Sequence, residues 1–216
     1  MRVKGAWLCM AGGLLWAAKA AYDWLWLDRQ INRGYPASDV TDYIDFLFPL
    51  CCIGVLYDIS KRYGAAAGKA PAVASTGLAL TGAFHFSETY FADEGIPFGI
   101  LFLFTGLLLM LLGTLRLGVR LGSRAGGHRP LAWCLSSLSA AVCCFCLSPF
   151  AAASLTDEGA TAITVGLAMA IGLLWTAVGL AFVRSGPGSI RGGTGSLAWA
   201  ETLPEELAAR LRGKDE

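Results

Sequence analysis

One uninterrupted apolar stretch constrains this chain most. It covers residues 96–115 and reads IPFGILFLFTGLLLMLLGTL, with no charged residue between Glu94 and Arg116. A helix that crosses the ~30 Å hydrocarbon core of a bilayer needs about 20 apolar residues, at ~1.5 Å of rise each. A core helix of a soluble domain is usually shorter and interrupted by polar positions. The stretch therefore predicts a transmembrane helix, against which the weaker apolar stretches can be judged.

The composition of the whole chain agrees with a membrane protein. Of its 216 residues, 55% are hydrophobic and 15% are charged, whereas soluble domains carry about 25% charged residues. Apolar segments follow one another closely throughout residues 1–184, with no room between them for a separate soluble domain. We therefore expect an all-α fold, a polytopic bundle of transmembrane helices.

Six helices account for the apolar stretches. Their expected ranges are 5–27, 43–60, 71–91, 96–115, 131–153 and 160–183. The first follows a basic start, as a signal peptide does, but it ends in bulky residues, so we interpret it as a retained helix. The third is rich in small residues, and we expect it inside the bundle. In the sixth, Gly166 with Ala170 and Ala168 with Gly172 have the small-xxx-small spacing of close helix contacts.

The charges between the helices predict the orientation of the chain. Basic residues precede the first helix and follow each even-numbered one, whereas acidic residues dominate the other connections. The basic residues are Arg2, Lys4, Lys61, Arg62, Lys69, Arg116, Arg120, Arg124, Arg129, Arg184 and Arg191. Cytoplasmic loops carry the excess of Lys and Arg. We therefore expect a multi-pass protein of the cell membrane with both termini in the cytoplasm.

Residues 185–216 differ in composition from the rest of the chain. A Gly/Ser-rich segment should form a flexible linker. A short amphipathic helix is expected after it, with Thr202 as N-cap and Pro204 in the first turn. This cytoplasmic tail would dock a protein partner, lie on the membrane surface, or remain a frayed terminal helix.

Five ionisable residues are expected in the outer half of the membrane, where charge is costly and usually functional. They are Lys19, Asp23, Asp45, His85 and Glu88. The aromatic residues expected around them are Tyr22, Trp24, Tyr43, Phe84, Phe86 and Tyr90. Two interpretations stay open: a polar cavity that binds a small solute or a proton, or helix-end groups that reach the headgroups beside an interfacial aromatic belt. For Asp58, near the inner end of the second helix, we expect a local salt bridge with Lys61 or Arg62.

Other chemistry has less support in the sequence. His85 and Glu88 share a helix face, but a catalytic metal site needs a third ligand, and we expect neither a metal nor another cofactor. The seven cysteines fall within the expected helices, including Cys143 and Cys146 in a CxxC spacing, and we interpret them as small packing residues. The chain has no phosphate-binding loop, hydrolase motif or nucleic-acid motif.

Two segments resemble small six-helix bacterial membrane proteins. The first helix contains AGGLLW at residues 11–16, and the fourth contains GLLLMLLG at residues 106–113, followed by Arg116 and Gly118. The resemblance covers most of the membrane region and implies a bacterial protein with the same six-helix fold. That group has no assigned activity, so the resemblance implies no catalytic residue.

Three functions remain as hypotheses. The first is a non-enzymatic structural or accessory subunit, which contacts lipid and, through its tail, a protein partner. The second is a small-solute or proton-coupled transporter, or a receptor, with its site in the outer polar layer. The third is a membrane-embedded enzyme that uses His85 and Glu88 as an acid–base pair. The first predicts that neutralising these two residues is harmless and that deleting the tail is not, whereas the second predicts the reverse.

Overall fold

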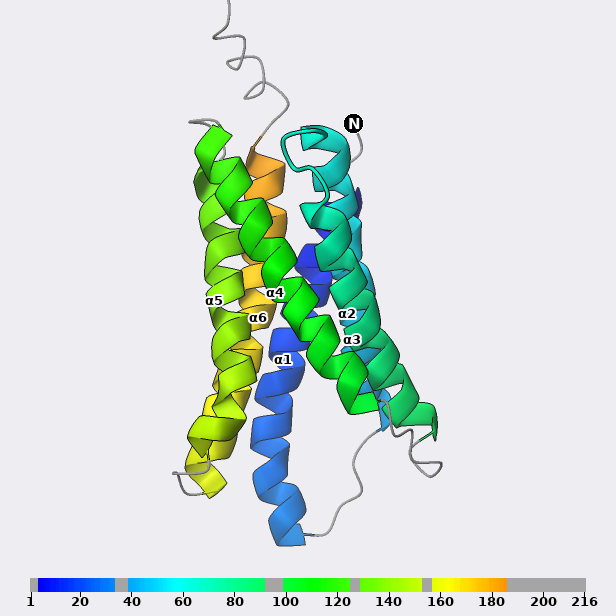
Figure 1. Cartoon of the computed structure of the whole chain (residues 1–216). Helices are drawn as coiled ribbons and strands as arrows, with labels where there is room; N and C mark the ends of the chain where they lie inside the picture. Colours follow the sequence, from blue (N-terminus) through cyan, green and yellow to red (C-terminus); the bar gives the residue numbers. More distant parts are fainter. Residues whose placement is uncertain (1–3, 34–38, 92–98, 125–128, 153–156, 186–216) are drawn as a thin grey trace, which may run out of the picture.

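The computed structural model describes residues 4–33, 39–91, 99–124, 129–152 and 157–185, and these are all-helical apart from one turn. The helices are α1 (Lys4–Arg33), α2 (Asp39–Tyr63), α3 (Ala70–Phe91), α4 (Gly99–Arg124), α5 (Arg129–Ala152) and α6 (Asp157–Arg184). Successive helices run antiparallel (Figure 1). We call the end of the bundle that holds Lys4 and Arg184 the terminal end, and the opposite end the distal end. The tail expected after Arg184 lies outside the described residues from 186 onward.

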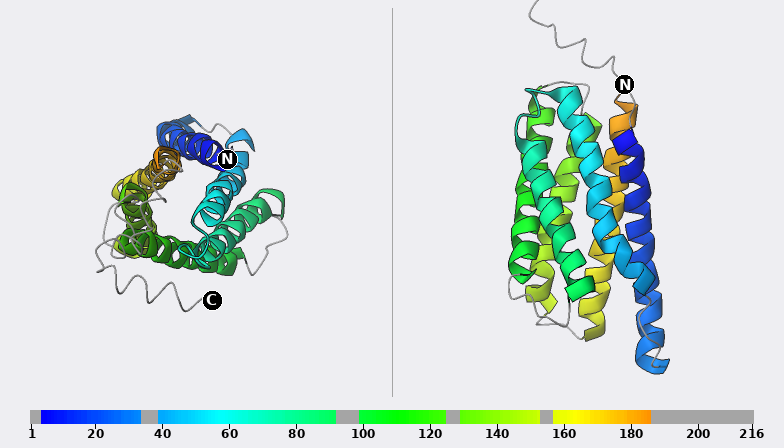
Figure 2. Two further views of the ribbon diagram at one scale, coloured as in Figure 1. Left: turned by 90° about the horizontal axis from the view of Figure 1, so that it is seen from above. Right: turned by 90° about the vertical axis from the view of Figure 1, so that its right-hand side faces the viewer.

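The six helices form a closed ring in chain order. Each helix packs against the one before and the one after it, and α6 returns to α1 (Figure 2). None of the described helices lies at the centre of the ring, so the expectation that the third helix is enclosed by the others is wrong. Instead α3 forms the wall between α2 and α4. Its small residues Ala74 and Gly77 let the backbone of α4 approach closely.

The interior of the ring is filled most completely in its terminal half. Large side chains that are fully buried come mostly from the parts of the helices that lie toward that end. They are Val55, Leu56, Ile59, Leu117, Leu121, Leu131, Leu135, Leu138, Trp175 and Phe182, with Leu78 and Val142 nearer the middle. Because close packing leaves little free volume, the terminal half is a compact apolar plug. The internal cavities described below lie on its distal side.

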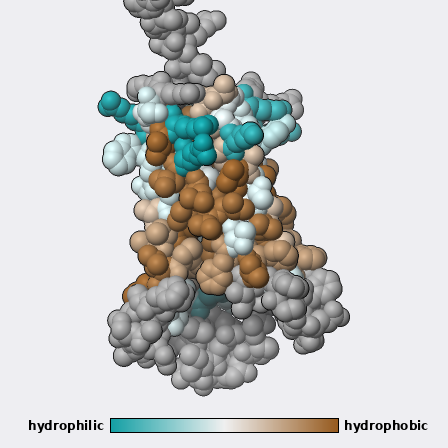
Figure 3. Space-filling view, in the orientation of Figure 1, coloured by the Kyte–Doolittle hydropathy of each residue, from teal (hydrophilic) through white to brown (hydrophobic). Residues whose placement is uncertain are grey.

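The outer surface of the ring is strongly apolar. Among the described residues, four helices are by length and composition apolar enough to cross a membrane, namely α2 over Tyr43–Tyr63, α4 over Leu101–Ser123, α5 over Arg129–Ser148 and α6 over Thr161–Arg184. Large hydrophobic side chains are exposed on all six helices, and a brown hydrophobic band lies next to the hydrophilic terminal end in Figure 3. Soluble monomers rarely expose apolar surface on this scale. These features fit a multi-pass membrane protein.

The helices differ from the expected ranges mainly at their ends. α4 continues beyond Leu115 to Arg124, and α2 begins at Asp39 rather than at Tyr43. Apolar residues mark the part of a helix that lipid or the core covers, whereas backbone hydrogen bonds continue until the helix is capped. Hydropathy therefore locates the helices but underestimates their length.

Two charged residues of α2 cap other helices at the terminal end. Asp58 Oδ2 accepts a hydrogen bond from the backbone N–H of Gly5, at 3.0 Å, in the first turn of α1, where a carboxylate is favoured by the helix dipole. Arg62 Nη1 donates to the carbonyl oxygens of Phe182 and Ser185, at 2.7 Å and 3.0 Å, where α6 ends. The guanidinium carbon also lies 3.7 Å from the centroid of the Phe182 ring. The local salt bridge expected for Asp58 is therefore wrong, because both side chains bind the ends of other helices.

Replacing Arg62 by leucine should lower the stability of the bundle by about 2 kcal/mol, because two charge-assisted hydrogen bonds to α6 are lost. Lys61→Leu is a matched control, since the Lys61 ammonium lies over the Tyr57 ring of its own helix, 4.5 Å from the centroid. Thermal unfolding of the purified full chain in detergent, followed by circular dichroism, compares the two. Equal melting temperatures for the two variants would show that Arg62 does not hold α6.

Candidate functional site: a charge cluster beside a central cavity

Three charged side chains meet in the distal half, where α1 contacts α2. Lys19 and Asp23 lie one turn apart on α1, with 2.6 Å between Lys19 Nζ and Asp23 Oδ2. The same Nζ lies 3.2 Å from Oδ2 of Asp45 on α2. The side chains of Lys19 and Asp45 are 13% and 18% exposed, whereas that of Asp23 is 41% exposed. This charge cluster, defined by Lys19, Asp23 and Asp45, therefore reaches the surface through Asp23.

The pairing of Lys19 with two carboxylates explains how the protein tolerates charges whose side chains are largely buried in the bundle. Moving a charge out of water costs several kcal/mol, and a partner compensates only when it is in direct contact. The Lys19 ammonium has two such partners, within 3.2 Å. One cation against two carboxylates gives the charge cluster a formal net charge of −1.

Two adjoining cavities lie beside the charge cluster. The first has a volume of about 140 Å³ and is lined by all three members of the cluster together with residues of α6. The second has a volume of about 130 Å³, lies nearer the middle of the bundle and is lined by all six helices. The residues that line both cavities are Trp16, Asp45, Phe145 and Ala168. Asp45 thus belongs at once to the charge cluster and to both cavities.

The second cavity is apolar except for a few side chains. Its apolar lining comprises Phe48, Pro49, Leu78, Leu103, Leu107, Met110 and Ile171 besides the shared residues. Its ionisable lining residues are Asp45 and His85. The hydroxyl of Thr81, which also lines it, donates to the carbonyl oxygen of Gly77 at 3.0 Å. An apolar cavity of about 150 Å³ is large enough to hold benzene, so each of these cavities suits a molecule of roughly that size.

Trp16 forms much of the wall that the two cavities share. Its ring stacks on Phe48 of α2 with 4.7 Å between centroids, and it forms an edge-to-face pair with the His85 ring of α3, with 6.3 Å between centroids. Its Nε1 donates to the carbonyl oxygen of Ala168 on α6, at 3.0 Å. The His85 ring in turn lies 5.2 Å from that of Phe84. Contacts with three other helices hold the indole in one orientation.

The structure brings four of the five candidate residues to one region. Lys19, Asp23 and Asp45 are in direct contact, and His85 lines the cavity that Asp45 also lines. Glu88 belongs to α3, but its side chain lies outside the part of the chain that the structure describes. The contact of Lys19 with Asp45 joins α1 to α2, so the charge cluster is not confined to one helix.

Sequence reasoning missed the aromatic lining of the cavities. Trp16 precedes Lys19 by three residues and Phe48 follows Asp45 by three, so each shares a helix face with a candidate charge. That spacing could have identified them. Phe145 had no such signal, because its helix carries none of the candidate residues. Of the aromatic residues expected around the site, Phe84 is buried beside His85, and the Tyr90 side chain lies outside the described residues. The other four are exposed: Tyr22, Trp24, Tyr43 and Phe86.

Two further features concern the possible metal ligands and the cysteines in the described part of the chain. There, no three His, Cys, Asp or Glu side chains are grouped as metal ligands would be. The seven cysteines are free thiols. The Cys9 thiol, for example, donates to the carbonyl oxygen of Trp175 across the contact of α1 with α6, at 3.3 Å, which is a packing role.

Comparison with protein-family models, with curated proteins and with solved structures finds no match, so no functional family is identified. The described residues form six helices, with a charge cluster beside a central cavity. Its function has to be argued from that site.

Proposed function

We propose that the chain is a six-span protein of the cell membrane, with both termini in the cytoplasm, and that its distal cavities bind a small solute as a receptor or transporter would. α1 and α3 are 30 and 22 residues long. Each packs between two helices that are apolar enough to cross a membrane. A closed ring of antiparallel helices enters a bilayer as one unit, which supports six spans. Basic residues gather at the terminal end, which favours the cytoplasmic side for it.

The observation that carries the binding function is the double role of Asp45, which pairs with Lys19 and lines both cavities. A purely structural bundle gains little from this arrangement. Replacing a buried ion pair by apolar residues is often stabilising, and filling a cavity usually is too. Intramembrane charges beside a concave, mostly apolar space are instead typical of ligand sites.

The charges and rings of the site favour a small organic cation as the ligand, or a proton. The charge cluster has a formal net charge of −1, and one bound positive charge would neutralise it. Trp16, Phe48 and Phe145 line the second cavity, and aromatic faces attract ammonium groups. An amine of about the size of benzene, at most ~150 Å³, satisfies both the charge and the volume.

The closed packing of the terminal half distinguishes a receptor from a transporter. Between the second cavity and that end lies the apolar plug, which includes Trp175 and Phe182. A receptor would keep this plug closed. A transporter would alternate with a conformation in which the plug opens, and it would then have to break the contacts that Arg62 makes with the end of α6.

The other two hypotheses depend on residues that lie outside the described part of the chain. A structural or accessory subunit would make its contacts through the lipid-facing helices and through the tail, residues 186–216, which lies outside the described residues. An enzyme would depend on the pair His85 and Glu88, and the side chain of Glu88 lies outside the described residues. Neither hypothesis uses the charge cluster.

Asp45→Asn should weaken the binding of small amines about tenfold or more, because a charge-assisted contact of ~1.5–3 kcal/mol is lost. The probes are methylammonium, butylammonium and benzylammonium, with benzyl alcohol and benzoate as neutral and anionic counterparts. Binding is measured by isothermal titration calorimetry on the purified full chain in nanodiscs. Thr76→Val, on the exposed face of α3, should leave the binding unchanged, and so should deletion of residues 186–216. If no ammonium binds better than its counterparts, or if Asp45→Asn binds it equally well, the proposed ligand class is wrong.

A further inference from the structure

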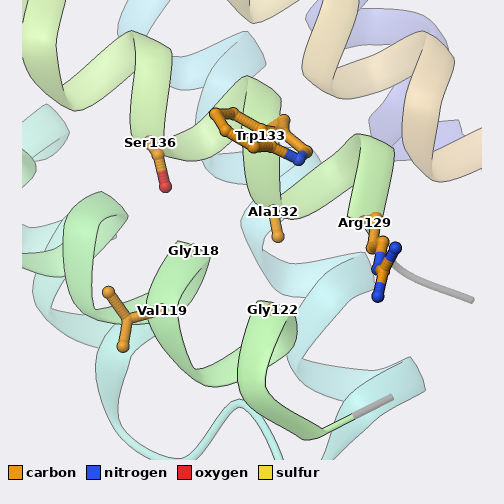
Figure 4. A pocket seen from close by; sticks show the side chains of 7 residues that line it. All are labelled: Gly118, Val119, Gly122, Arg129, Ala132, Trp133 and Ser136. Atoms are coloured by element: carbon orange, nitrogen blue, oxygen red, sulfur yellow. The ribbon is translucent and has the colours of Figure 1, made fainter. Parts of the chain in front are cut away.

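A groove lies on the outside of the ring, between α4 and α5 near the terminal end (Figure 4). Its volume is about 410 Å³, within the range of about 300–1,000 Å³ that is usual for ligand sites. The residues that line it are Gly118, Val119 and Gly122 of α4 and Arg129, Ala132, Trp133 and Ser136 of α5. It is separate from the distal cavities and shares no lining residue with them.

Two glycines of α4 shape the floor of this α4–α5 groove. At Gly118 the two helices touch, since a Cβ added there would lie 2.8 Å from Ser136 Oγ and 3.1 Å from the carbonyl oxygen of Ala132. One turn further toward the terminal end, a Cβ at Gly122 would meet the Cβ of Ala132 only at 3.5 Å, an ordinary contact. The helices therefore diverge toward the terminal end and leave the backbone of α4 uncovered.

The lining combines a positive charge with apolar surface in a fixed order. Arg129 is the first residue of α5 and is exposed at the terminal end. Trp133 lies one turn deeper and is 72% exposed. None of the seven lining residues is acidic. Arginine at headgroup depth, tryptophan at the interface and a channel that is apolar apart from Ser136 at its deep end match the order of phosphate, glycerol and acyl chain in a phospholipid.

We propose that the α4–α5 groove is a binding site for an anionic phospholipid of the leaflet at the terminal end. The phosphate would lie at the Arg129 guanidinium, and one acyl chain would lie along Gly122 and Val119 beside Trp133, ending where the helices touch at Gly118. Charge complementarity favours a lipid over a second copy of the chain. A second copy seated here would bring its own basic terminal end, with Arg116 and Arg129 exposed, close to the same residues.

The test measures lipid retention by the purified full chain with native mass spectrometry, during titration with dioleoyl phosphatidylglycerol or dioleoyl phosphatidylcholine. We expect the phosphatidylglycerol to bind more tightly. Arg129→Gln should lower its affinity about fivefold, since one Arg near an anionic lipid contributes ~1 kcal/mol, and should leave phosphatidylcholine nearly unchanged. Arg184→Gln, an exposed arginine on α6 outside the groove, should have less effect. If both variants lost the same affinity for phosphatidylglycerol, the preference would come from the overall positive charge of the terminal end and not from the groove. That result would overturn the proposal.

A second variant tests the groove rather than the charge. Gly122→Leu fills the channel without a backbone clash at its Cβ, so the bundle should remain folded while the site for the acyl chain is lost. We expect weaker retention of both lipids and an unchanged oligomeric state. If this variant retains both lipids and changes the oligomeric state instead, the groove is an interface between copies and the lipid site is wrong.

Discussion

Replacing Lys19 by methionine will destabilise the bundle by about 3 kcal/mol, because two carboxylates then face each other without their cation. This value is the lower end of the ~3–5 kcal/mol expected when one partner of a buried ion pair is removed. The lower end applies because Asp23 is 41% exposed and can be hydrated. The penalty should fall mainly on Asp45, which is 18% exposed. Thermal unfolding in detergent, followed by circular dichroism, measures it.

A second substitution identifies which carboxylate causes the loss. Adding Asp45→Asn to Lys19→Met should restore most of the stability, because the uncompensated charge next to the cavities is removed. Adding Asp23→Asn instead should restore less. Lys61→Met, at an exposed position of α2, controls for the loss of a lysine and should change the melting temperature little. A Lys19→Met variant as stable as the unmodified chain would mean that the charge cluster contributes nothing to the fold.

Helix positions were predictable from the sequence because hydropathy is a local property. Each of the six apolar stretches overlaps one observed helix. The level of the charged residues along the bundle was predictable for the same reason, since position along a helix translates directly into distance from its end. This is why Lys19, Asp23 and Asp45 could be assigned to one layer before their contacts were known.

Helix adjacency was not predictable, because it depends on contacts between residues far apart in the chain. Small residues in α3 suggested an enclosed helix, but they serve to let α4 approach. Asp58 has basic neighbours one turn away, yet it caps α1, whose start lies more than fifty residues earlier. The cavities are lined from all six helices, so only the closed ring defines them.

The two small-residue pairs of α6 also show that the sequence does not reveal which helix face meets a neighbour. By spacing alone, Gly166 with Ala170 and Ala168 with Gly172 were equivalent. In the structure a Cβ added at Gly172 would lie 2.7 Å from the carbonyl oxygen of Gly13 and would clash with α1, whereas one at Gly166 would meet nothing within 4 Å. Only the helix face that turns toward α1 uses its small residues for a close contact.

Gly172→Ala will therefore destabilise the bundle by about 1–3 kcal/mol, the usual cost of overpacking a close contact. A Cβ at this position would also lie 2.9 Å from the backbone nitrogen of Ala17. The third clashing atom is Cδ1 of the Trp16 side chain, also at 2.9 Å. Because the other two belong to the backbone of α1, the two helices must move apart even if the indole turns away. Gly166→Ala is a matched control on the same helix. It should stabilise the chain by up to ~1 kcal/mol, because alanine restricts the unfolded backbone and favours the helix.

The same substitution links the packing of the ring to the proposed site. Trp16 lies one turn from Gly13 and donates its indole N–H to the carbonyl oxygen of Ala168, one turn from Gly172. If α1 and α6 move apart, this hydrogen bond lengthens and the wall shared by the two cavities shifts. Gly172→Ala should then weaken benzylammonium binding as well as lower the melting temperature, whereas Gly166→Ala should leave the binding unchanged. Loss of stability without loss of binding would show that the α1–α6 contact supports the fold but does not position the cavity wall.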